Sequence, residues 1–299
     1  MSAQAIIRRY KRIIDILESG QYPSLEDIIE YIERVGLKTS KRTIERDFEA
    51  IRNDFDIEIE YNRTKRGYFI NQEKSLPIDN FLRLLELVET AHILQESLKE
   101  SKETLSYIDF EYEGIESGIE HLQNTLQAIR NLQLIRFDHE SYQTGKTRSY
   151  TVKPYLIKEY QGRWYVVGEV KGRKEFRTFG MDRINKLEVL ADTFTPKENV
   201  NVKERFQDVV GLTYSVSEMQ KVVLAVKNKQ VPYLKSVPLH ASQRIVEEKD
   251  GETIIELYLK PNFEFIQRIF MQMDMARVIE PEEIKNEIRV RLNRMKNMY

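Results

Sequence analysis

The chain has 299 residues, which is enough for two or three domains of ~100–200 residues each. A formal net charge of −1 and the absence of cysteine exclude a strongly basic overall field, disulfides, thiolate zinc sites and cysteine nucleophiles. No apolar run approaches the ~20 residues that span a bilayer, and residues 2–12 lack the pattern of a signal peptide, so we expect a cytoplasmic protein.

The first 70 residues predict three helices followed by a β-hairpin. Apolar residues recur at helical spacing over residues 6–17. A second helix is expected over residues 24–35, where a serine precedes an acidic first turn, and a third begins after Ser40. Two strands, residues 57–61 and 68–70, flank a basic turn. This order describes a winged helix-turn-helix.

The third helix has an apolar stripe on one side and long polar donors on the other. The stripe consists of Ile44, Phe48, Ile51 and Phe55. A recognition helix presents such donors to base edges in the major groove, where an arginine can make two parallel hydrogen bonds to guanine. We therefore expect duplex DNA contacts from this helix and from the hairpin tip, at Lys41, Arg42, Thr43, Arg46, Lys65 and Arg66. The alternative is a helix face and a turn that are merely solvated.

The charge of this segment is balanced. Residues 1–70 contain 13 Lys and Arg and 13 Asp and Glu, so any DNA affinity must come from local patches of cations. Each phosphate contact would add about −0.9 to the slope of log affinity against log salt. We therefore expect modest non-specific affinity, with a dimer doubling the number of contacts.

The third helix also carries a family motif. Residues 40–47, Ser-Lys-Arg-Thr-Ile-Glu-Arg-Asp, resemble the S-x-R-T-I-x-R-D recognition helix of DeoR-like winged helices, and Arg66-Gly67-Tyr68 resembles their wing. The resemblance covers about residues 5–70. It implies DNA contacts from the same cations and extends them to Ser40 and Tyr68.

A mostly helical linker is expected over residues 77–133. Its first helix has a stripe that consists of Phe81, Leu84, Leu85, Val88, His92 and Gln95. Residues 101–114 are polar and acidic and predict a loop. A second helix should run from about Gly114 to Leu132.

From residue 134 the apolar period changes to two. Five short strands close together are typical of a small barrel or a strongly bent sheet, and they are expected at 134–139, 149–158, 163–171, 175–181 and 184–191. In the last domain the pattern predicts a strand (220–227), a helix (231–236), two strands (243–248 and 253–260), a helix (262–273), a strand (275–280) and a helix (281–297). Asp250-Gly251 joins its middle strands. The βαββαβ order is ferredoxin-like, so we expect a multidomain α+β protein.

The strand with the only tryptophan begins a candidate ligand surface. Alternation places Trp164 in the core and Tyr165 on the opposite side. Downstream, Arg177 and Phe179 share a strand face, and Arg183 follows at the same parity. Two arginines and an aromatic ring suit an anion, because a guanidinium group bonds phosphate or carboxylate in bidentate fashion and a ring can stack on a base. The alternative is that the arginines only pair with acids such as Glu175 and Asp182.

The middle and the end of the chain resemble two known domains. Residues 134–192 are similar to the WYL domain at Pro154, Trp164-Tyr165-Val166, Arg177 and Asp182-Arg183-Ile184. The last domain resembles the WCX extension at Pro238-Leu239-His240, Pro261-Asn262-Phe263-Glu264 and Ile279-Glu280-Pro281. We call the expected winged helix-turn-helix the head. With the head included, the resemblance implies a bacterial transcription regulator with an Sm-like sensor barrel. The expected domains are a winged helix-turn-helix (1–72), a helical linker (73–133), the WYL domain (134–195), a connecting segment (196–219) and the WCX domain (220–299).

The resemblance also implies an effector site. By position its residues are Tyr165, Arg177, Phe179 and Arg183, with His139 in addition. The effector of related regulators is a nucleic acid, notably single-stranded DNA, or a nucleotide. Two departures bear on this site. Val166 replaces the leucine of the name, and Tyr150 stands where many members have an arginine, so the affinity for the ligand or its identity can differ here.

No enzyme motif is found. The four histidines are scattered, without metal-ligand spacing, and the chain has no glycine-rich phosphate loop and no G-x-S-x-G. Glu111, Glu113 and Glu116 form an acidic cluster that we interpret as a solvated loop. We therefore expect no catalysis, no cofactor and no metal.

The expected function is that of an effector-responsive transcription regulator. A homodimer would bind a palindromic duplex operator with half-sites ~10 bp or multiples of that apart, and an effector in the barrel would bias the two heads. One alternative is a nucleic-acid-binding adaptor that regulates a partner enzyme. Another is a constitutive DNA binder whose barrel is purely structural.

Overall fold

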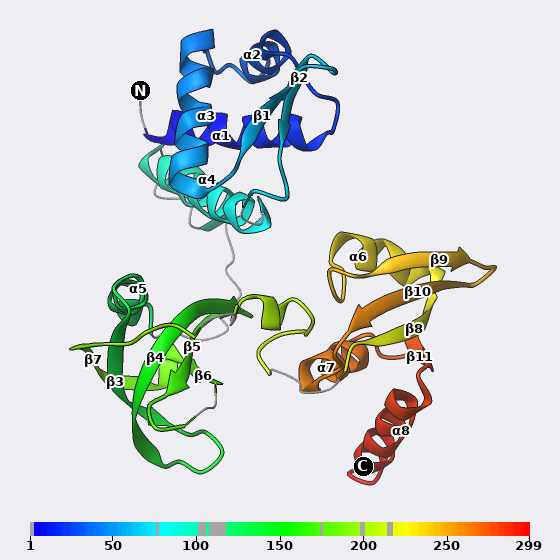
Figure 1. Cartoon of the computed structure of the whole chain (residues 1–299). Coiled ribbons are helices and arrows are strands. Elements are labelled where there is room, and N and C mark those ends of the chain that lie inside the picture. The colour runs from blue at the N-terminus through cyan, green and yellow to red at the C-terminus, as the bar shows by residue number, and fades with distance from the viewer. Residues whose placement is uncertain are drawn as a thin grey trace. The chain divides into compact units, whose positions relative to one another are not determined.

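The computed structural model of the chain forms two compact units, residues 1–112 and residues 113–299 (Figure 1). The residues that it describes are 3–75, 78–100, 106–107, 118–173, 176–197, 201–213 and 218–299. Most of the expected loop over residues 101–114 and the whole acidic cluster of three glutamates lie outside the described residues.

The first unit contains the predicted three helices and hairpin, followed by a long helix. Its elements are α1 (Ala3–Glu18), α2 (Leu25–Glu33), α3 (Lys41–Phe55), β1 (Ile59–Asn62), β2 (Gly67–Ile70) and α4 (Ile78–Glu100). Both expected N-caps are present. Ser24 forms a capping box with Asp27, and the Ser40 hydroxyl accepts from the backbone N–H of Thr43. Such caps satisfy N–H groups that have no partner inside the helix.

A buried ion pair joins α1 to α3. The Arg9 guanidinium donates to both carboxylate oxygens of Asp47, at 2.6 Å and 3.0 Å, and both residues are 1% exposed. The pair lies beside a core that contains Ile13, Ile44 and Ile51. It fixes the face of α3 that packs on α1, while Arg42 and Arg46 lie away from that face and are exposed.

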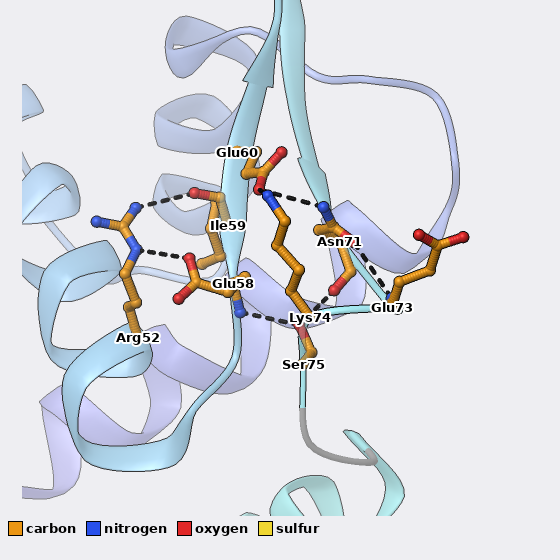
Figure 2. A network of polar contacts seen from close by, with 8 residues as sticks. All are labelled: Arg52, Glu58, Ile59, Glu60, Asn71, Glu73, Lys74 and Ser75. Atoms are coloured by element: carbon orange, nitrogen blue, oxygen red, sulfur yellow. Dashed lines mark hydrogen bonds and ion pairs between the residues drawn. The ribbon is translucent and has the colours of Figure 1, made fainter.

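The hairpin is attached to the helices at two places. At its tip, the N–H of Tyr68 donates to the carbonyl of Pro23, and a Cβ on Gly67 would lie 1.7 Å from the carbonyl oxygen of Tyr22. Only glycine fits there. At its base, Arg52 of α3 contacts the Glu58 carboxylate at 3.1 Å and donates to the Ile59 carbonyl (Figure 2).

The second half of the hairpin base is held by a polar cluster. Glu60 accepts from Asn71 and Lys74, and the Ser75 hydroxyl accepts from the N–H of Glu58 (Figure 2). Together with Arg52, these contacts set the position of the hairpin relative to α3.

The apolar stripe predicted for α4 is buried only in part. Ile78, Phe81 and Leu85 are buried in the core of the head, with the Phe81 ring 4.3 Å from that of Phe55. Leu84 and Val88, by contrast, are 48% and 38% exposed. The head therefore covers Ile78, Phe81 and Leu85 of α4 and leaves Leu84 and Val88 exposed.

The second unit begins with a helix on an antiparallel sheet. Its elements are α5 (Leu122–Arg130), β3 (Gln133–Glu140), β4 (Thr147–Tyr160), β5 (Arg163–Val170), β6 (Phe176–Gly180) and β7 (Ile184–Thr193), with the short 3₁₀ helices η2 (Ile119–His121) and η3 (Met181–Arg183). The strand order is β6-β5-β4-β3-β7. Helix α5 packs beside β3, β4 and β7 (Figure 1), with Ala128 in the sheet core.

The tryptophan strand follows the predicted alternation. Trp164 is half-buried and packs against a core that includes Val166 and Val170. A register shift between Pro154 and Leu156 interrupts the pairing of β4 with β5. A Cβ on Gly168 would lie 2.5 Å from the carbonyl oxygen of Lys153, so this glycine permits the close approach of β4.

The elements predicted after residue 219 are all present, with ends that differ by at most two residues. They are β8 (Gln220–Lys227), α6 (Val231–Ser236), β9 (Arg244–Glu248), β10 (Glu252–Leu259), α7 (Phe263–Met271), β11 (Ala276–Glu280) and α8 (Glu282–Lys296). The strands form an antiparallel sheet in the order β11-β8-β10-β9. As expected, Gly251 lies in the turn between β9 and β10, with φ +85°.

The buried pair predicts a large loss of stability when one partner is removed. Asp47→Ala leaves the Arg9 guanidinium buried without its counterion, which costs about 3–5 kcal/mol of the free energy of unfolding measured with denaturant. Replacing both residues together, as Arg9→Met with Asp47→Leu, should restore much of the loss. Arg34→Ala, which breaks an exposed pair with Glu30, is the matched control and should change little. Equal losses for Asp47→Ala and Arg34→Ala would contradict this role of the pair.

Candidate functional site

The residues predicted to contact DNA occupy the start of α3 and the hairpin tip. Lys41, Arg42 and Arg46 are exposed. The hydroxyls of Ser40 and Thr43 lie 2.9 Å apart and cap the helix, so both residues also have a structural role. The first turn of α3 therefore points cations to solvent from a fixed N-terminus.

The cations of the head fall into two classes. Six of them contact carboxylates, namely Arg8, Arg9, Lys11, Arg12, Arg34 and Arg52. No ion pair within the described residues of the first unit involves the other seven, which are all exposed: Lys38, Lys41, Arg42, Arg46, Arg63, Lys65 and Arg66. We call these seven residues the unpaired cations. They lie on α3, on the turn before it and on the hairpin, so a head with no net charge presents positive charge at those places.

The hairpin tip has a defined shape. The Asn62 carboxamide oxygen accepts from the N–H groups of Thr64 and Lys65, and Arg66 adopts φ +54°. The Lys65 ammonium lies 3.9 Å from the centre of the Tyr22 ring. The Tyr68 ring packs 5.0 Å from that of Phe48 and is half-buried. Tyr68 therefore connects the hairpin to α3, whatever else it contacts.

A second polar group surrounds Arg183 in the five-stranded sheet domain. The Arg183 guanidinium lies 4.9 Å from the centre of the Tyr142 ring and 3.7 Å from the Asp182 carboxylate. Asp182 also lies 3.7 Å from Arg163 and accepts from the Tyr142 hydroxyl. Gly180 permits this arrangement, because a Cβ there would lie 2.7 Å from the Arg183 guanidinium. Asp182 therefore lies within ion-pair distance of both Arg163 and Arg183.

His139 and Tyr165 belong to the same group. Burial and then the charge of Arg183 lower the pKa of His139 to about 4, while Asp182 opposes the shift. The Nε2 atom of His139 is buried, and within the described residues it has no hydrogen-bond partner. Burial and then Asp182 raise the pKa of Tyr165. An anion near Arg183 would therefore meet a neutral histidine and a neutral phenol.

The other two predicted ligand residues lie differently. Phe179 is 3% exposed, and its ring packs 5.3 Å from His139 and 5.0 Å from Tyr150. Its place is therefore behind the polar group, as support for those two rings. Arg177 pairs with Gly168 on β5 and lies three residues before Gly180, about 10 Å along an extended strand. Glu175, its alternative partner, lies outside the described residues.

Sequence reasoning missed Tyr142, Arg163 and the central position of Asp182. Tyr142 lies in the turn between β3 and β4, where period-two patterning gives no information. Tyr142 is 65% exposed, and the sequence marks it only as one aromatic residue in a polar loop. The alternative that Arg183 pairs with Asp182 is present in the structure, at the 3.7 Å given above.

Family models match the two C-terminal domains. The WYL domain model matches residues 120–189 and the WCX domain model matches residues 218–296. The chain carries a WYL domain followed by a WCX domain. The WYL match begins inside the range 73–133 that the sequence assigned to a linker, and so includes α5, which packs on the sheet. This pair of domains is typical of transcriptional regulators, which are typically not enzymes.

Several proteins are distantly similar to the chain. Protein PafB of Mycobacterium tuberculosis (strain ATCC 25618 / H37Rv) and Protein PafB of Mycobacterium bovis (strain ATCC BAA-935 / AF2122/97) are each 24% identical over 182 residues. The match covers 60% of this chain and 54% of each relative, so the chain spans about half the length of the curated relatives it matches.

Two solved structures also align with the chain. Proteasome accessory factor B/C of Arthrobacter aurescens is 17% identical, with 95% of this chain and 46% of that chain covered and a TM-score of 0.35. A CRISPR Cas-related protein is 17% identical, with 61% and 52% covered and a TM-score of 0.25.

Two other kinds of feature are absent from the described residues. In this part of the chain, no helix combines the length and apolar character needed to cross a bilayer. The same residues contain no group of three or more His, Cys, Asp or Glu side chains placed to hold a metal ion.

The low pKa of His139 predicts a pH dependence with a definite sign. The folded pKa of about 4 lies below the ordinary value of 6.5, so the unfolded chain binds the proton more tightly. The contribution of the His139 imidazole to the free energy of unfolding is therefore complete above pH 6.5 and is lost as pH falls toward 4. NMR titration of the imidazole should give a pKa of about 4, and His139→Gln should remove this part of the pH dependence of unfolding. An imidazole that titrates near 6.5 would contradict the buried placement.

Proposed function

We propose that the chain is an effector-responsive transcription regulator whose first unit is a winged helix-turn-helix that binds duplex DNA. The observation that carries the proposal is the position of the unpaired cations. They occupy the third helix, the turn before it and the hairpin, and in this class of fold the helix and the hairpin enter or flank a groove. The fixed contacts between Arg52, Glu58 and the hairpin base would hold both elements in one register on the duplex.

The proposed homodimer would place two heads on a palindromic operator. Two-fold symmetry in the protein matches two-fold symmetry in the DNA, with half-sites one helical turn or multiples of it apart. The exposed face of α4, with Leu84 and Leu87 about half exposed, follows the head directly and offers apolar surface for a second copy. Burying such a face contributes about 25 cal/mol for each Å².

The WYL domain is proposed as the effector-binding part, with an Sm-like barrel. A helix precedes its strands, a 3₁₀ helix comes before its last strand, and the order β6-β5-β4-β3-β7 supports this topology. A ferredoxin-like fold is proposed for the WCX domain, and its βαββαβ order and its strand order β11-β8-β10-β9 support this proposal.

The proposed effector is a nucleic acid, notably single-stranded DNA, or a nucleotide. Arg163 and Arg183 would bind its phosphate by displacing Asp182, and the Tyr142 ring would stack on a base. Stacking of this kind contributes about 1–3 kcal/mol for each base. His139, held neutral, would take up a proton when the phosphate arrives, so effector affinity should increase as pH falls.

The proposal predicts that two arginines of α3 carry duplex recognition. Arg42→Ala and Arg46→Ala should each weaken binding to a selected operator by about 1–3 kcal/mol, because each removes a bidentate contact to a base. Binding is measured by titration of a labelled duplex obtained by selection from a random pool. The thermal unfolding of both variants should match that of the wild type, since both side chains are exposed.

Arg8→Ala is the matched control. Arg8 lies in the same head but contacts Glu89 of α4, so its removal should leave duplex affinity nearly unchanged. The assignment of α3 as the recognition helix fails if Arg8→Ala weakens binding as much as Arg42→Ala, or if neither arginine of α3 matters. Wild-type protein that selects no duplex at all would favour the adaptor function instead.

A further inference from the structure

The segment between the WYL and WCX domains is clamped onto the WCX domain. Nε2 of His240 lies 2.7 Å from the carbonyl oxygen of Gln207. The N–H of Lys260 donates to the carbonyl of Asp208 at 2.6 Å, and the Lys260 ammonium lies 3.0 Å from the Asp208 carboxylate. These contacts come from the Pro-Leu-His motif and from the residue before the Pro-Asn-Phe-Glu motif, which the sequence singled out without a role.

The start of α7 completes the clamp. The Asn262 side chain caps α7 and donates to the carbonyls of Val210 and Thr213 at 2.6 Å and 2.9 Å. The buried Glu264 carboxylate accepts three bonds through one oxygen, from the N–H of Leu212, the N–H of Thr213 and the Thr213 hydroxyl. We call residues 207–213 the clamped segment.

The same segment contacts the WYL domain on its other side. The Thr178 hydroxyl of β6 donates to the carbonyl of Leu212 at 3.5 Å. Thr178 lies between Arg177 and Phe179, and its side chain points to the face opposite to theirs. Two residues later, Gly180 meets the guanidinium of Arg183. A shift of β6 that follows a change at Arg183 would therefore move the carbonyl of Leu212.

Gly211 is enclosed between the two domains. Its φ is +73°, and a Cβ there would lie 2.7 Å from Cγ of Glu264 and 3.0 Å from Cζ of Tyr160. Tyr160 belongs to β4 of the WYL domain and Glu264 to α7 of the WCX domain. Gly211 therefore lies in contact range of both the WYL and the WCX domain, and its surroundings leave no room for a side chain.

We propose that the clamped segment is the mechanical coupling between the effector site and the WCX domain, with Glu264 as its positioning residue. The inference rests on the proposed function of the WYL domain. It adds the route by which a change at the effector site reaches the WCX domain. Occupation of the Arg183 group shifts β6, the Thr178 contact transmits the shift to Leu212, and the Glu264 carboxylate passes it to α7. Coupling of this kind needs an element that two sites both bias. The Leu212–Thr213 peptide is such an element, because its carbonyl accepts from Thr178 of the WYL domain and its N–H donates to Glu264 of the WCX domain.

The test measures coupling separately from binding. Affinity for a selected duplex is measured with and without a saturating mixed-sequence single-stranded DNA oligonucleotide. In the wild type the oligonucleotide should change duplex affinity by ~5- to 150-fold. Gly211→Ala should reduce this ratio to within about 2-fold of unity, because its methyl group forces Tyr160 and Glu264 apart. Its affinity for the oligonucleotide and for the duplex alone should stay at the wild-type value.

Gly251→Ala is the matched control, because Gly251 has φ +85° and no atom lies within 4 Å of the position that its Cβ would take. Gly251→Ala introduces a methyl group at a similar positive φ but without a close contact. It should therefore keep the wild-type ratio of duplex affinities with and without the oligonucleotide. A Gly211→Ala protein that keeps the full ratio overturns the coupling role. A wild-type ratio of one overturns the proposed effector instead.

A double-mutant cycle tests the coupling without any ligand. Thr178→Val and Glu264→Gln each loosen one side of the Leu212–Thr213 peptide. Their effects on the thermal unfolding of the full chain should therefore be non-additive. Additive shifts overturn the coupling even when the wild type responds to the oligonucleotide. Non-additive shifts with a wild-type ratio of one support the mechanical link and reject only the proposed effector.

Discussion

The buried pair between Arg9 and Asp47 is the constraint on which the head depends. Two charges removed from water are tolerated only when they neutralise each other with good geometry, and here the guanidinium bonds both carboxylate oxygens. The pair specifies which face of α3 packs on α1. Arg42 and Arg46 lie away from that face and are exposed. The last residue of the Ser-Lys-Arg-Thr-Ile-Glu-Arg-Asp motif is thus structural, whereas its basic residues are exposed.

Equal numbers of positive and negative residues do not make a uniform surface. In the head, acids such as Glu30, Glu58 and Glu89 neutralise cations on the helices and at the hairpin base, and the unpaired cations collect on α3 and the hairpin. The WYL domain uses the reverse arrangement, because Asp182 lies among its own arginines. Cations without an ion-pair partner suit a polyanion such as DNA. Arginines that already contact Asp182 suit a ligand that must displace this carboxylate.

Local signals predicted the elements well, and tertiary packing decided the rest. Caps at Ser24 and Ser40 and the period-two runs gave the order of helices and strands in both units. Leu84 and Val88 belong to the predicted stripe of α4 but are exposed, since periodicity cannot show which neighbour covers a stripe. The place of Phe179 in the core and the gathering of Tyr142 with Arg183 depend on contacts between residues distant in sequence. The Arg9 and Asp47 pair, 38 residues apart, could not be seen for the same reason.

The salt dependence of duplex binding tests the central claim most directly, that unpaired cations on α3 and the hairpin bind the DNA. Log affinity of the wild type should fall linearly with log salt concentration. Lys65→Ala with Arg66→Ala should make the slope shallower by about 0.9 for each phosphate that these two side chains neutralise. The same duplex and the same salts serve for both proteins. A slope near zero for the wild type, or one that both proteins share, would contradict the account.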